Sequence, residues 1–480
     1  MSIATGPSDP TPPAELRTTA GGGSRFEIEP GLPDPNGGGE GATAVPDAER
    51  RAGLEGTIRV PGDKSMSHRS MLFGAIAHGD TEVTGFLEGE DSLHTLEALR
   101  AMGVTIERGA PGEVRVHGRG PGALAPPRGE LYLGNSGTAM RLMAGLLAGL
   151  GLPATLTGDD SLSGRPMARV VDPLTRMGAR VGTAADGRPP LAIEGGRALA
   201  GIEYDSPIAS AQVKSSILLA GLHASGTTTV HEPAVTRDHT ERMLRGFGVD
   251  VRTDGLTCSL EGGQRLTGAS LTVPGDVSSA TFFIVGACLS PGRTLTIENV
   301  GMNPSRTGVV EILRLMGARI EERNARDAGG EPVADLVVTG APLAGIEVPE
   351  RLVSLAIDEF PAIFVAAVGA EGETVVTGAE ELRVKETDRI AVMVDGLRAL
   401  GADIEDRPDG ARIRGGRLSG GTVDSRGDHR PAMAFAMAGL ISRGPITVLG
   451  CDNVNTSFPG FARLAAGAGL PIVERRGGGA

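Results

Sequence analysis

Lysine is rare in this chain, and its positions raise a chemical question. Of the 46 basic side chains, 43 are arginine, and lysine occurs only at Lys64, Lys214 and Lys385. An ammonium group can release its proton when burial or a neighbouring charge lowers its pKa, whereas a guanidinium stays protonated. Lys64, in the stretch VPGDKSMSHRS, is therefore a candidate for proton transfer or for a site too tight for arginine. For Lys214 we expect a surface or interdomain position.

Cationic side chains gather near residues that we expect to start helices. The expected starts are residue types that cap helix N-termini: Ser65, Asn135, Ser210, Asp276, Asp358 and Asp428. Free amides at a helix N-terminus also bind anions, and cations flank these starts or open the other helices: Lys64, Arg69, Arg165, Arg237, Lys385, Arg389 and Arg430. This pattern predicts a small ligand that carries several phosphate or carboxylate groups.

Several other kinds of chemistry lack their motifs. The nucleotide phosphate loop GxxxxGK[ST] is absent, because Asp63 separates Gly62 from Lys64. There is no GxGxxG after a predicted strand and no GxSxG, which excludes a dinucleotide site and a serine-hydrolase elbow. The three cysteines, Cys258, Cys288 and Cys451, form no CxxC. They indicate neither a zinc site nor a disulfide scaffold, and they favour a reducing cytoplasm.

Composition narrows the class of protein further. The chain has 480 residues, 40% of them hydrophobic, which predicts a soluble protein of several domains. A net charge of −13 and 3% aromatic residues argue against nucleic-acid binding, and no apolar run is long enough to span a membrane. Residues 1–50 are rich in Gly and Pro and lack apolar periodicity, so we expect a disordered tail there.

The body of the chain repeats a helix–glycine–strand pattern six times. The glycines that end the helices are Gly103, Gly178, Gly248, Gly317, Gly401 and Gly469. We expect each to take the left-handed conformation that closes a helix. A second series of small-residue helices that lead into Thr- and Val-rich strands interleaves with the first. Helices that alternate with strands in this way predict an α/β protein.

A longer repeat groups the six units into two halves. VPGD occurs at 60–63 and again at 273–276, each time before a helix. We therefore predict one globular domain over 63–272 and a second, similar one from 51–62 together with 273–480. Ligand sites favour such domain interfaces, so we expect the anion site between the two domains.

Eight segments together resemble one enzyme family. In chain order these are PGDKSMSHR, LGNSGTAMRL, GDDSLSGRPM, ASAQVKSSILLAG, MNPSRTG, IDEFP, LRVKETDR and DHRPAMAF. They are similar to the EPSP synthases, 3-phosphoshikimate 1-carboxyvinyltransferases, over roughly residues 54 to 475. The resemblance implies an inside-out α/β barrel in each of two domains, built from three βαβαββ units apiece. It also implies a reaction in which the 5-hydroxyl of shikimate 3-phosphate attacks C2 of phosphoenolpyruvate and phosphate is then released.

The resemblance also assigns roles residue by residue. It implies Asp358 as the base on the 5-hydroxyl, Glu386 as the partner for protonation at C3, and Lys64 in proton transfer at both substrates. The shikimate 3-phosphate ligands would be Lys64, Ser65, Arg69, Ser210, Ala211, Gln212, Arg237, Asp358 and Lys385. The phosphoenolpyruvate ligands would be Lys64, Gly137, Arg165, Gln212, Arg389 and Arg430, with His429 a weaker candidate. The family needs no metal and no organic cofactor, and we expect a cytoplasmic monomer.

Two positions depart from one branch of the family. Thr456 in NTSFPGF stands where that branch has a lysine, and Leu142 stands where it has a proline, so the chain resembles the more divergent branch. Two alternatives stay open. The first is a UDP-N-acetylglucosamine enolpyruvyl transferase, a family with Lys-Asn in place of Lys64-Ser65 and usually a loop cysteine. The second is a homologue that binds anions without catalysis. In the EPSP synthases a glycine at the place of Gly137 also admits the herbicide glyphosate.

Overall fold

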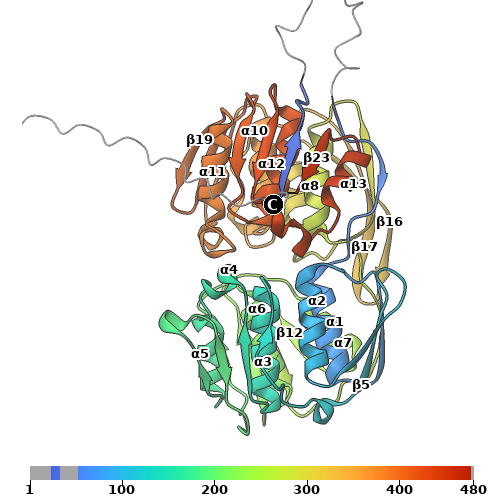
Figure 1. Cartoon of the computed structure of the whole chain (residues 1–480), viewed down its shortest axis with the longest axis vertical. Coiled ribbons are helices and arrows are strands. Elements are labelled where there is room, and N and C mark those ends of the chain that lie inside the picture. The colour runs from blue at the N-terminus through green and yellow to red at the C-terminus, as the bar shows by residue number, and fades with distance from the viewer. Residues whose placement is uncertain (1–22, 33–51, 477–480) are drawn as a thin grey trace, which may run out of the picture.

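The computed structural model describes residues 23–32 and 52–476, and these residues form two halves (Figure 1). The chain leaves the upper half near residue 62, builds the whole lower half, and returns to the upper half near residue 273. Segments from the two ends of the chain therefore lie together in the upper half, where the blue strand β1 (Arg25–Ile28) runs beside the red strand β23 (Ile472–Arg475).

Three small sheets and their helices form the lower half. The first sheet has the order β14 (Ser270–Thr272), β3 (His78–Thr84), β5 (Val114–Arg119), β4 (Thr105–Arg108), and its helices are α1 (Lys64–Ile76) and α2 (Glu90–Ala101). The second has β6 (Leu131–Tyr132), β7 (Ala154–Thr157), β9 (Leu191–Ile193), β8 (Val181–Gly182), with α3 (Gly137–Leu150), α4 (Asp160–Ser163) and α5 (Ala168–Arg176). The third has β10 (Glu203–Asp205), β11 (Thr227–His231), β13 (Thr257–Glu261), β12 (Val251–Asp254), with α6 (Ala211–Gly221) and α7 (His239–Gly246).

The upper half is built in the same way. Its first sheet has the order β2 (Gly56–Ile58), β15 (Thr294–Gly301), β17 (Glu331–Thr339), β16 (Arg319–Ala328), with α8 (Val277–Cys288) and α9 (Gly308–Leu315). The next has β18 (Glu373–Val376), β20 (Gly410–Arg414), β19 (Asp403–Arg407), with α10 (Phe360–Gly369) and α11 (Arg389–Ala399). The last has β21 (Gly421–Asp424), β22 (Ile446–Leu449), β1, β23, with α12 (His429–Ala438) and α13 (Phe461–Gly467).

One topology recurs through these sheets. In the third sheet β10 pairs parallel with β11, β11 pairs antiparallel with β13, and β13 closes antiparallel with β12. The sheets around β3, β7 and β15 repeat this arrangement. A parallel first pair requires a helical crossover, and the antiparallel remainder closes with a hairpin. The predicted α/β class with repeated βαβαββ units is therefore confirmed.

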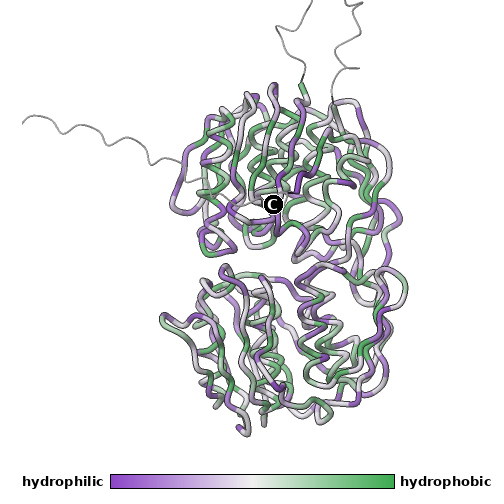
Figure 2. Tube along the Cα trace, in the orientation of Figure 1, coloured by the Kyte–Doolittle hydropathy of each residue, from purple (hydrophilic) through white to green (hydrophobic). Residues whose placement is uncertain are grey.

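The sheets lie outside and the most apolar helices lie inside. In the upper half, α8, α10 and α12 contact one another and are buried on nearly every side. In the lower half, α3 and α6 make the closest helix pair. A helix that is hydrophobic all round has to be covered on all sides, and in Figure 2 the green hydrophobic segments run through the interior of each half. This burial explains the inside-out arrangement that the family resemblance implies.

The tail prediction is wrong for one short segment. Arg25–Ile28 is a strand that pairs antiparallel with both β22 and β23, with Phe26 and Ile28 buried. In the other five sheets the corresponding central strand is the second strand of a hairpin within the same unit: β5, β9, β13, β17 or β20. In the last unit β1, from residues 25–28, takes this place between β22 and β23. The rest of the predicted tail, 1–22 and 33–50, lies outside the described residues.

The six repeat glycines adopt the predicted backbone conformation. Their φ angles lie between 87° and 110°, in the left-handed region that disfavours a side chain: Gly103, Gly178, Gly248, Gly317, Gly401 and Gly469. The predicted helix starts are only partly right. Ser210, Asp276 and Asp428 cap α6, α8 and α12 with their side chains, whereas α1 and α3 are capped by Asp63 and Ser136, one or two residues from the prediction.

Buried apolar side chains form two separate clusters. One contains residues from Phe26 to Val60 and from Val277 to Ile472, and the other contains residues from Met66 to Val273. Within the described residues, no helix is both long and apolar enough to cross a lipid bilayer. The crossings at 62 and 272 stay our proposed domain boundaries.

Candidate active site

A cavity of about 550 Å³ lies between the two halves. Every side chain that the sequence analysis assigned to the substrates or the chemistry contributes to its lining: Lys64, Ser65, Arg69, Gly137, Arg165, Ser210, Ala211, Gln212, Arg237, Asp358, Lys385, Glu386, Arg389 and Arg430. These residues come from both halves of the chain and from five of the six units. The tertiary structure therefore brings the predicted set together in one place.

The lining is cationic in an acidic protein. It includes ten lysine and arginine side chains and seven carboxylates, whereas the whole chain carries a net charge of −13. Within the described residues no cluster of His, Cys, Asp and Glu has the geometry to hold a metal ion. A cavity walled by guanidinium and ammonium groups favours a small ligand with several negative charges.

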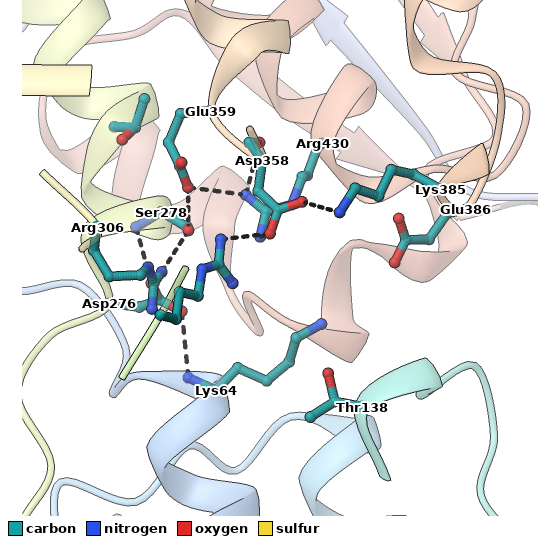
Figure 3. A network of polar contacts seen from close by, with 12 residues as sticks. Lys64, Thr138, Asp276, Ser278, Arg306, Asp358, Glu359, Lys385, Glu386 and Arg430 are labelled. Carbon is teal, nitrogen blue, oxygen red and sulfur yellow. Dashed lines mark hydrogen bonds and ion pairs between the residues drawn. The ribbon is translucent and has the colours of Figure 1, made fainter. Parts of the chain in front are cut away.

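Lys64 begins α1 at the floor of the cavity. Its ammonium lies 3.1 Å from Oδ2 of Asp91 in the first turn of α2. Its backbone amide donates to Oδ2 of Asp276 at 3.3 Å, as Figure 3 shows. Burial raises the pKa of Asp91, although Lys64 opposes this shift. The sequence analysis missed Asp91. The acidic pair Glu90-Asp91 at the start of α2 could have indicated it, but acidic residues are common in the first turn of any helix.

His68 connects the three helices α1, α2 and α3 beneath the cavity. It is fully buried on α1, and its Nδ1 lies 2.8 Å from Oγ1 of Thr95 on α2. Its Nε2 lies 3.3 Å from Oγ of Ser136, the residue that caps α3. Burial first, and then the nearby Lys64, lower the pKa of His68 to about 3, so the ring is neutral near pH 7.

The start of α3 brings Gly137 against two guanidinium groups. A Cβ atom at Gly137 would lie 2.8 Å from Nη1 of Arg141 and 3.0 Å from Nη1 of Arg165. Arg165 donates to Oδ1 of Asn135 at 2.5 Å and reaches Oε1 of Glu386 in the other half at 3.3 Å. Both guanidinium groups would have to shift to accommodate a methyl group at this position.

The start of α6 supplies a polar segment to the same wall. Ser210 caps the helix, and Gln212 accepts a hydrogen bond from Arg141 at 2.5 Å and donates to Thr138 at 2.9 Å. Arg141 was missed by the sequence analysis, because it lies inside a helix that is otherwise apolar. Arg69 is 2% exposed, and burial lowers its pKa to about 10.

Asp358 lies among cations from both halves. Its carboxylate accepts from Arg237 at 2.5 Å and from Arg389 at 3.1 Å, and it lies 3.4 Å from the ammonium of Lys385. Burial alone would raise the pKa of Asp358. Lys385, Arg237 and Arg430 outweigh that effect and hold the pKa well below 3.8.

Glu386 has a similar environment on the opposite side. Its carboxylate accepts from Arg389 and lies 3.3 Å from Arg165. Burial raises the pKa of Glu386, but the two arginines outweigh this effect and bring the pKa well below 4.5. Both proposed acid–base carboxylates are therefore ionised near pH 7 when the cavity holds no anion.

A buried network links the two chain crossings to this site (Figure 3). Arg306 donates to Asp63 at 2.7 Å and to Asp276 at 2.8 Å, the last residues of the two VPGD copies. It also donates to Ser278, whose hydroxyl donates to Glu359, and Glu359 lies 3.6 Å from Arg430. The sequence analysis assigned no role to Arg306, although this residue lies in the segment MNPSRTG that it quoted for the family resemblance.

Four further residues discussed from the sequence have clear positions. His429 lines the cavity, but burial and then Lys64 lower its pKa well below 6.5, so its ring is neutral near pH 7 and cannot act as an imidazolium acid. Lys214, Leu142 and Thr456 are buried and do not line the cavity. The expected surface position of Lys214 is therefore wrong, because two carboxylates accompany it into the interior.

Comparisons with known proteins agree on one family. The family model described as EPSP synthase (3-phosphoshikimate 1-carboxyvinyltransferase) matches residues 48–464. The 3-phosphoshikimate 1-carboxyvinyltransferase of Alkalilimnicola ehrlichii is 60% identical over 422 residues, which cover 88% of this chain and 95% of the relative. That of Acidithiobacillus ferrooxidans is 60% identical over 87% of this chain and 96% of the relative.

A solved structure shares the whole architecture. The EPSP synthase from Acinetobacter baumannii aligns with a TM-score of 0.82 and 52% sequence identity, over 94% of this chain and 100% of that chain. These matches set aside the alternative of a UDP-N-acetylglucosamine enolpyruvyl transferase. The chain belongs to the EPSP synthase family, the 3-phosphoshikimate 1-carboxyvinyltransferases.

Proposed function

We propose that the chain transfers the enolpyruvyl group of phosphoenolpyruvate to the 5-hydroxyl of shikimate 3-phosphate. The products are 5-enolpyruvylshikimate 3-phosphate and phosphate, on the route to the aromatic amino acids. The observation that carries this proposal is the single cationic cavity to which all fourteen predicted side chains contribute. Two phosphates and two carboxylates would enter this cavity with the substrates, and their charge is opposite in sign to that of the ten cationic side chains in its lining.

Shikimate 3-phosphate binds mainly on the side of α1, α6 and the loop before α7. The start of α6 offers hydroxyl and amide donors to its phosphate, and Arg237 and Lys385 approach from opposite halves. The full proposed set is Lys64, Ser65, Arg69, Ser210, Ala211, Gln212, Arg237, Asp358 and Lys385. A ligand held by both halves favours their closed arrangement, because each half contributes cations that only the closed form brings together.

Phosphoenolpyruvate binds beside it, against the start of α3. Arg165 lies next to Gly137 in the lower half, and Arg389 begins α11 in the upper half. The proposed set is Lys64, Gly137, Arg165, Gln212, Arg389 and Arg430. A planar guanidinium suits a carboxylate or phosphate because it can donate two parallel hydrogen bonds.

Substrate anions adjust the basicity of the two catalytic carboxylates. Without ligand, surrounding cations keep the pKa values of Asp358 and Glu386 well below their ordinary values. Phosphate and carboxylate groups that pair with Arg237, Lys385 and Arg165 weaken this effect, so the pKa values of both carboxylates rise. Asp358 then accepts the proton of the 5-hydroxyl, and Glu386 with Lys64 delivers a proton to C3.

We also propose a cytoplasmic monomer. The cytoplasm fits the three buried cysteines, which remain thiols in the structure. Burial raises the pKa of each thiol to about 12, so they are poorly reactive.

Release of phosphate tests the proposal. We expect the purified protein to release one phosphate for each enolpyruvyl ether formed from shikimate 3-phosphate and phosphoenolpyruvate. Asp358→Asn should bind shikimate 3-phosphate and lower turnover by a factor on the order of 10² or more, the scale of general-base catalysis. A protein that binds both substrates and releases no phosphate would instead be the non-catalytic homologue.

A further inference from the structure

Lys214 is the one lysine of this chain that the proposed chemistry does not use. It lies on α6 with 4% of its side chain exposed, and it does not line the cavity. Its ammonium is 2.6 Å from Oε2 of Glu232 and 2.7 Å from Oε1 of Glu241. Burial lowers the pKa of Lys214, but the two carboxylates outweigh burial and raise it, so the ammonium stays charged.

The two carboxylates lie at the two ends of one loop. Glu232 directly follows β11, and Glu241 lies in the first turn of α7. The residues between them include Arg237, whose guanidinium projects into the cavity and contacts Asp358. Thr236 donates to the second oxygen of Glu232, which holds the loop at a third point beside Arg237. Lys214 therefore ties both ends of the Arg237 loop to the interior of α6.

The same helix begins with another part of the proposed substrate site. Ser210, the residue that caps α6, lies one turn before Lys214, Gln212 lies two residues before it, and both line the cavity. Lys214 thus sets the distance between two segments that approach one ligand: the start of α6 and the Arg237 loop. Since ion pairs and hydrogen bonds between buried groups are short and directional, a small displacement here would change the position of the Arg237 guanidinium.

A second buried contact lies beside the triad of Lys214, Glu232 and Glu241, and it connects this triad to Arg69. Ser215 and Thr240 are the sequence neighbours of Lys214 and Glu241, and their hydroxyls lie 2.7 Å apart. Arg69 donates to Thr240 at 2.7 Å and to Ser215 at 2.8 Å. The triad of one lysine and two glutamates carries one excess negative charge, and Glu241 raises the pKa of Arg69 against the effect of burial. The triad therefore also stabilises the charge of Arg69.

We propose that Lys214, with Glu232 and Glu241, is a positioning residue for shikimate 3-phosphate. It sets the place of Arg237 relative to the start of α6, and it does not contact substrate itself. The proposal rests on the proposed function, since it names the substrate that these two segments bind. It also accounts for a lysine at this position, because a compact ammonium with three donors can join two carboxylates where a longer, planar guanidinium needs more room.

A charge-balanced variant tests this role without leaving a buried charge unpaired. Lys214→Met alone would leave two buried carboxylates facing each other, so the test uses Lys214→Met combined with Glu232→Gln and Glu241→Gln. We expect its KM for shikimate 3-phosphate to rise about 10-fold, while its KM for phosphoenolpyruvate and its kcat change by less than about 3-fold. The matched control is Leu260→Ala, a cavity in β13 of the same sheet, which lowers stability without removing any charge of Lys214, Glu232 or Glu241.

Hydrogen exchange gives a readout that does not depend on substrate. In the triple variant, backbone amides of residues 234–237 should exchange faster than in the wild type, and those of β13 should not. Equal rises in both KM values, the same substrate effect in Leu260→Ala, or unchanged exchange in the loop would each overturn the proposal. Failure of the proposed function would show separately, as a wild-type protein that releases no phosphate from the two substrates.

Discussion

The guanidinium of Arg237 donates to the carboxylate of Asp358 at 2.5 Å, although the two residues are 121 positions apart and belong to opposite halves. Two more ion pairs cross the same gap: Arg165 lies 3.3 Å from Glu386, and Arg169 lies 2.8 Å from Glu381. The groups proposed to bind or convert the substrates therefore pair with one another when the cavity holds no anion. Substrate phosphates and carboxylates compete for the same cations.

This competition predicts a change of shape on binding. Partly exposed ion pairs contribute only about 0.2–1 kcal/mol each, so we expect the free protein to sample a wider cleft, with hinges near residues 60 and 272. Both substrates together should then contract it, and small-angle scattering should show a smaller radius of gyration. Arg169→Gln should enlarge the radius of the free protein, since it removes one crossing pair. A radius that is the same with and without both substrates would contradict this prediction.

Lys64 should be irreplaceable by arginine. Its ammonium pairs with Asp91 and faces the cavity, where the proposed chemistry needs a group that can transfer a proton. We expect Lys64→Arg to fold and to bind shikimate 3-phosphate, yet to lose turnover by a factor on the order of 10² or more. Steady-state rates together with calorimetric binding check this. Near-normal turnover would show that Lys64 acts through charge alone.

Gly137 should determine sensitivity to glyphosate. A Cβ atom at this position would come within 2.8 Å of Arg141 and 3.0 Å of Arg165, so a methyl group narrows the proposed phosphoenolpyruvate pocket. We expect competitive inhibition of the wild type, and an affinity for glyphosate about 10- to 200-fold weaker in Gly137→Ala, with a smaller loss for phosphoenolpyruvate. Inhibition constants for the two proteins decide the matter. Equal inhibition of both would mean that Gly137 does not control access.

His68 should hold its proton on Nδ1. Thr95 donates to the carbonyl of Asp91, and Ser136 accepts from the amide of Ala139, so Thr95 accepts from Nδ1 and Ser136 donates to Nε2. With a pKa of about 3, the ring should not titrate between pH 6 and 8. Long-range ¹⁵N NMR on histidine-labelled protein, with the signal assigned by its loss in His68→Asn, measures both properties. A proton on Nε2, or titration in this range, would contradict the network.

Stability should fall as the pH drops below 6.5. Burial lowers the pKa of His223 to about 4, so below its unfolded pKa of 6.5 the unfolded chain binds more protons than the folded one. The stabilisation by this neutral histidine is therefore complete above 6.5 and is lost toward about pH 4. Between pH 7.5 and 5.5 one such group costs about 1 kcal/mol of unfolding free energy.

The matched variant is His223→Gln, which cannot take up this proton. We expect its urea midpoint to fall less between pH 7.5 and 5.5 than that of the wild type, because one histidine with a lowered pKa no longer contributes. His68 and His429 have pKa values shifted in the same direction, so part of the slope should remain. Parallel loss of stability in both proteins would show that the pKa of His223 is not lowered in the folded protein.

The sixfold repeat and most residues of the site could be predicted from local sequence. A glycine that ends a helix in the left-handed conformation and a residue that caps a helix depend only on near neighbours, so the six glycines were predicted correctly and the helix starts nearly so. The predicted substrate ligands occur in motifs that keep their order along the chain, and all of them reached the cavity.

Only the tertiary structure decided which distant segments meet. The sequence of Arg25–Ile28 is too short to indicate a strand, and its place follows from a sheet that lacks a central strand of its own. Lys214 looks like a surface residue until Glu232 and Glu241 are brought beside it. A charged side chain enters the interior only with partners, and partners from other elements cannot be identified by local pattern. For the same physical reason, Asp91, Arg141 and Arg306 became visible as site residues only after the fold placed their partners from other elements beside them.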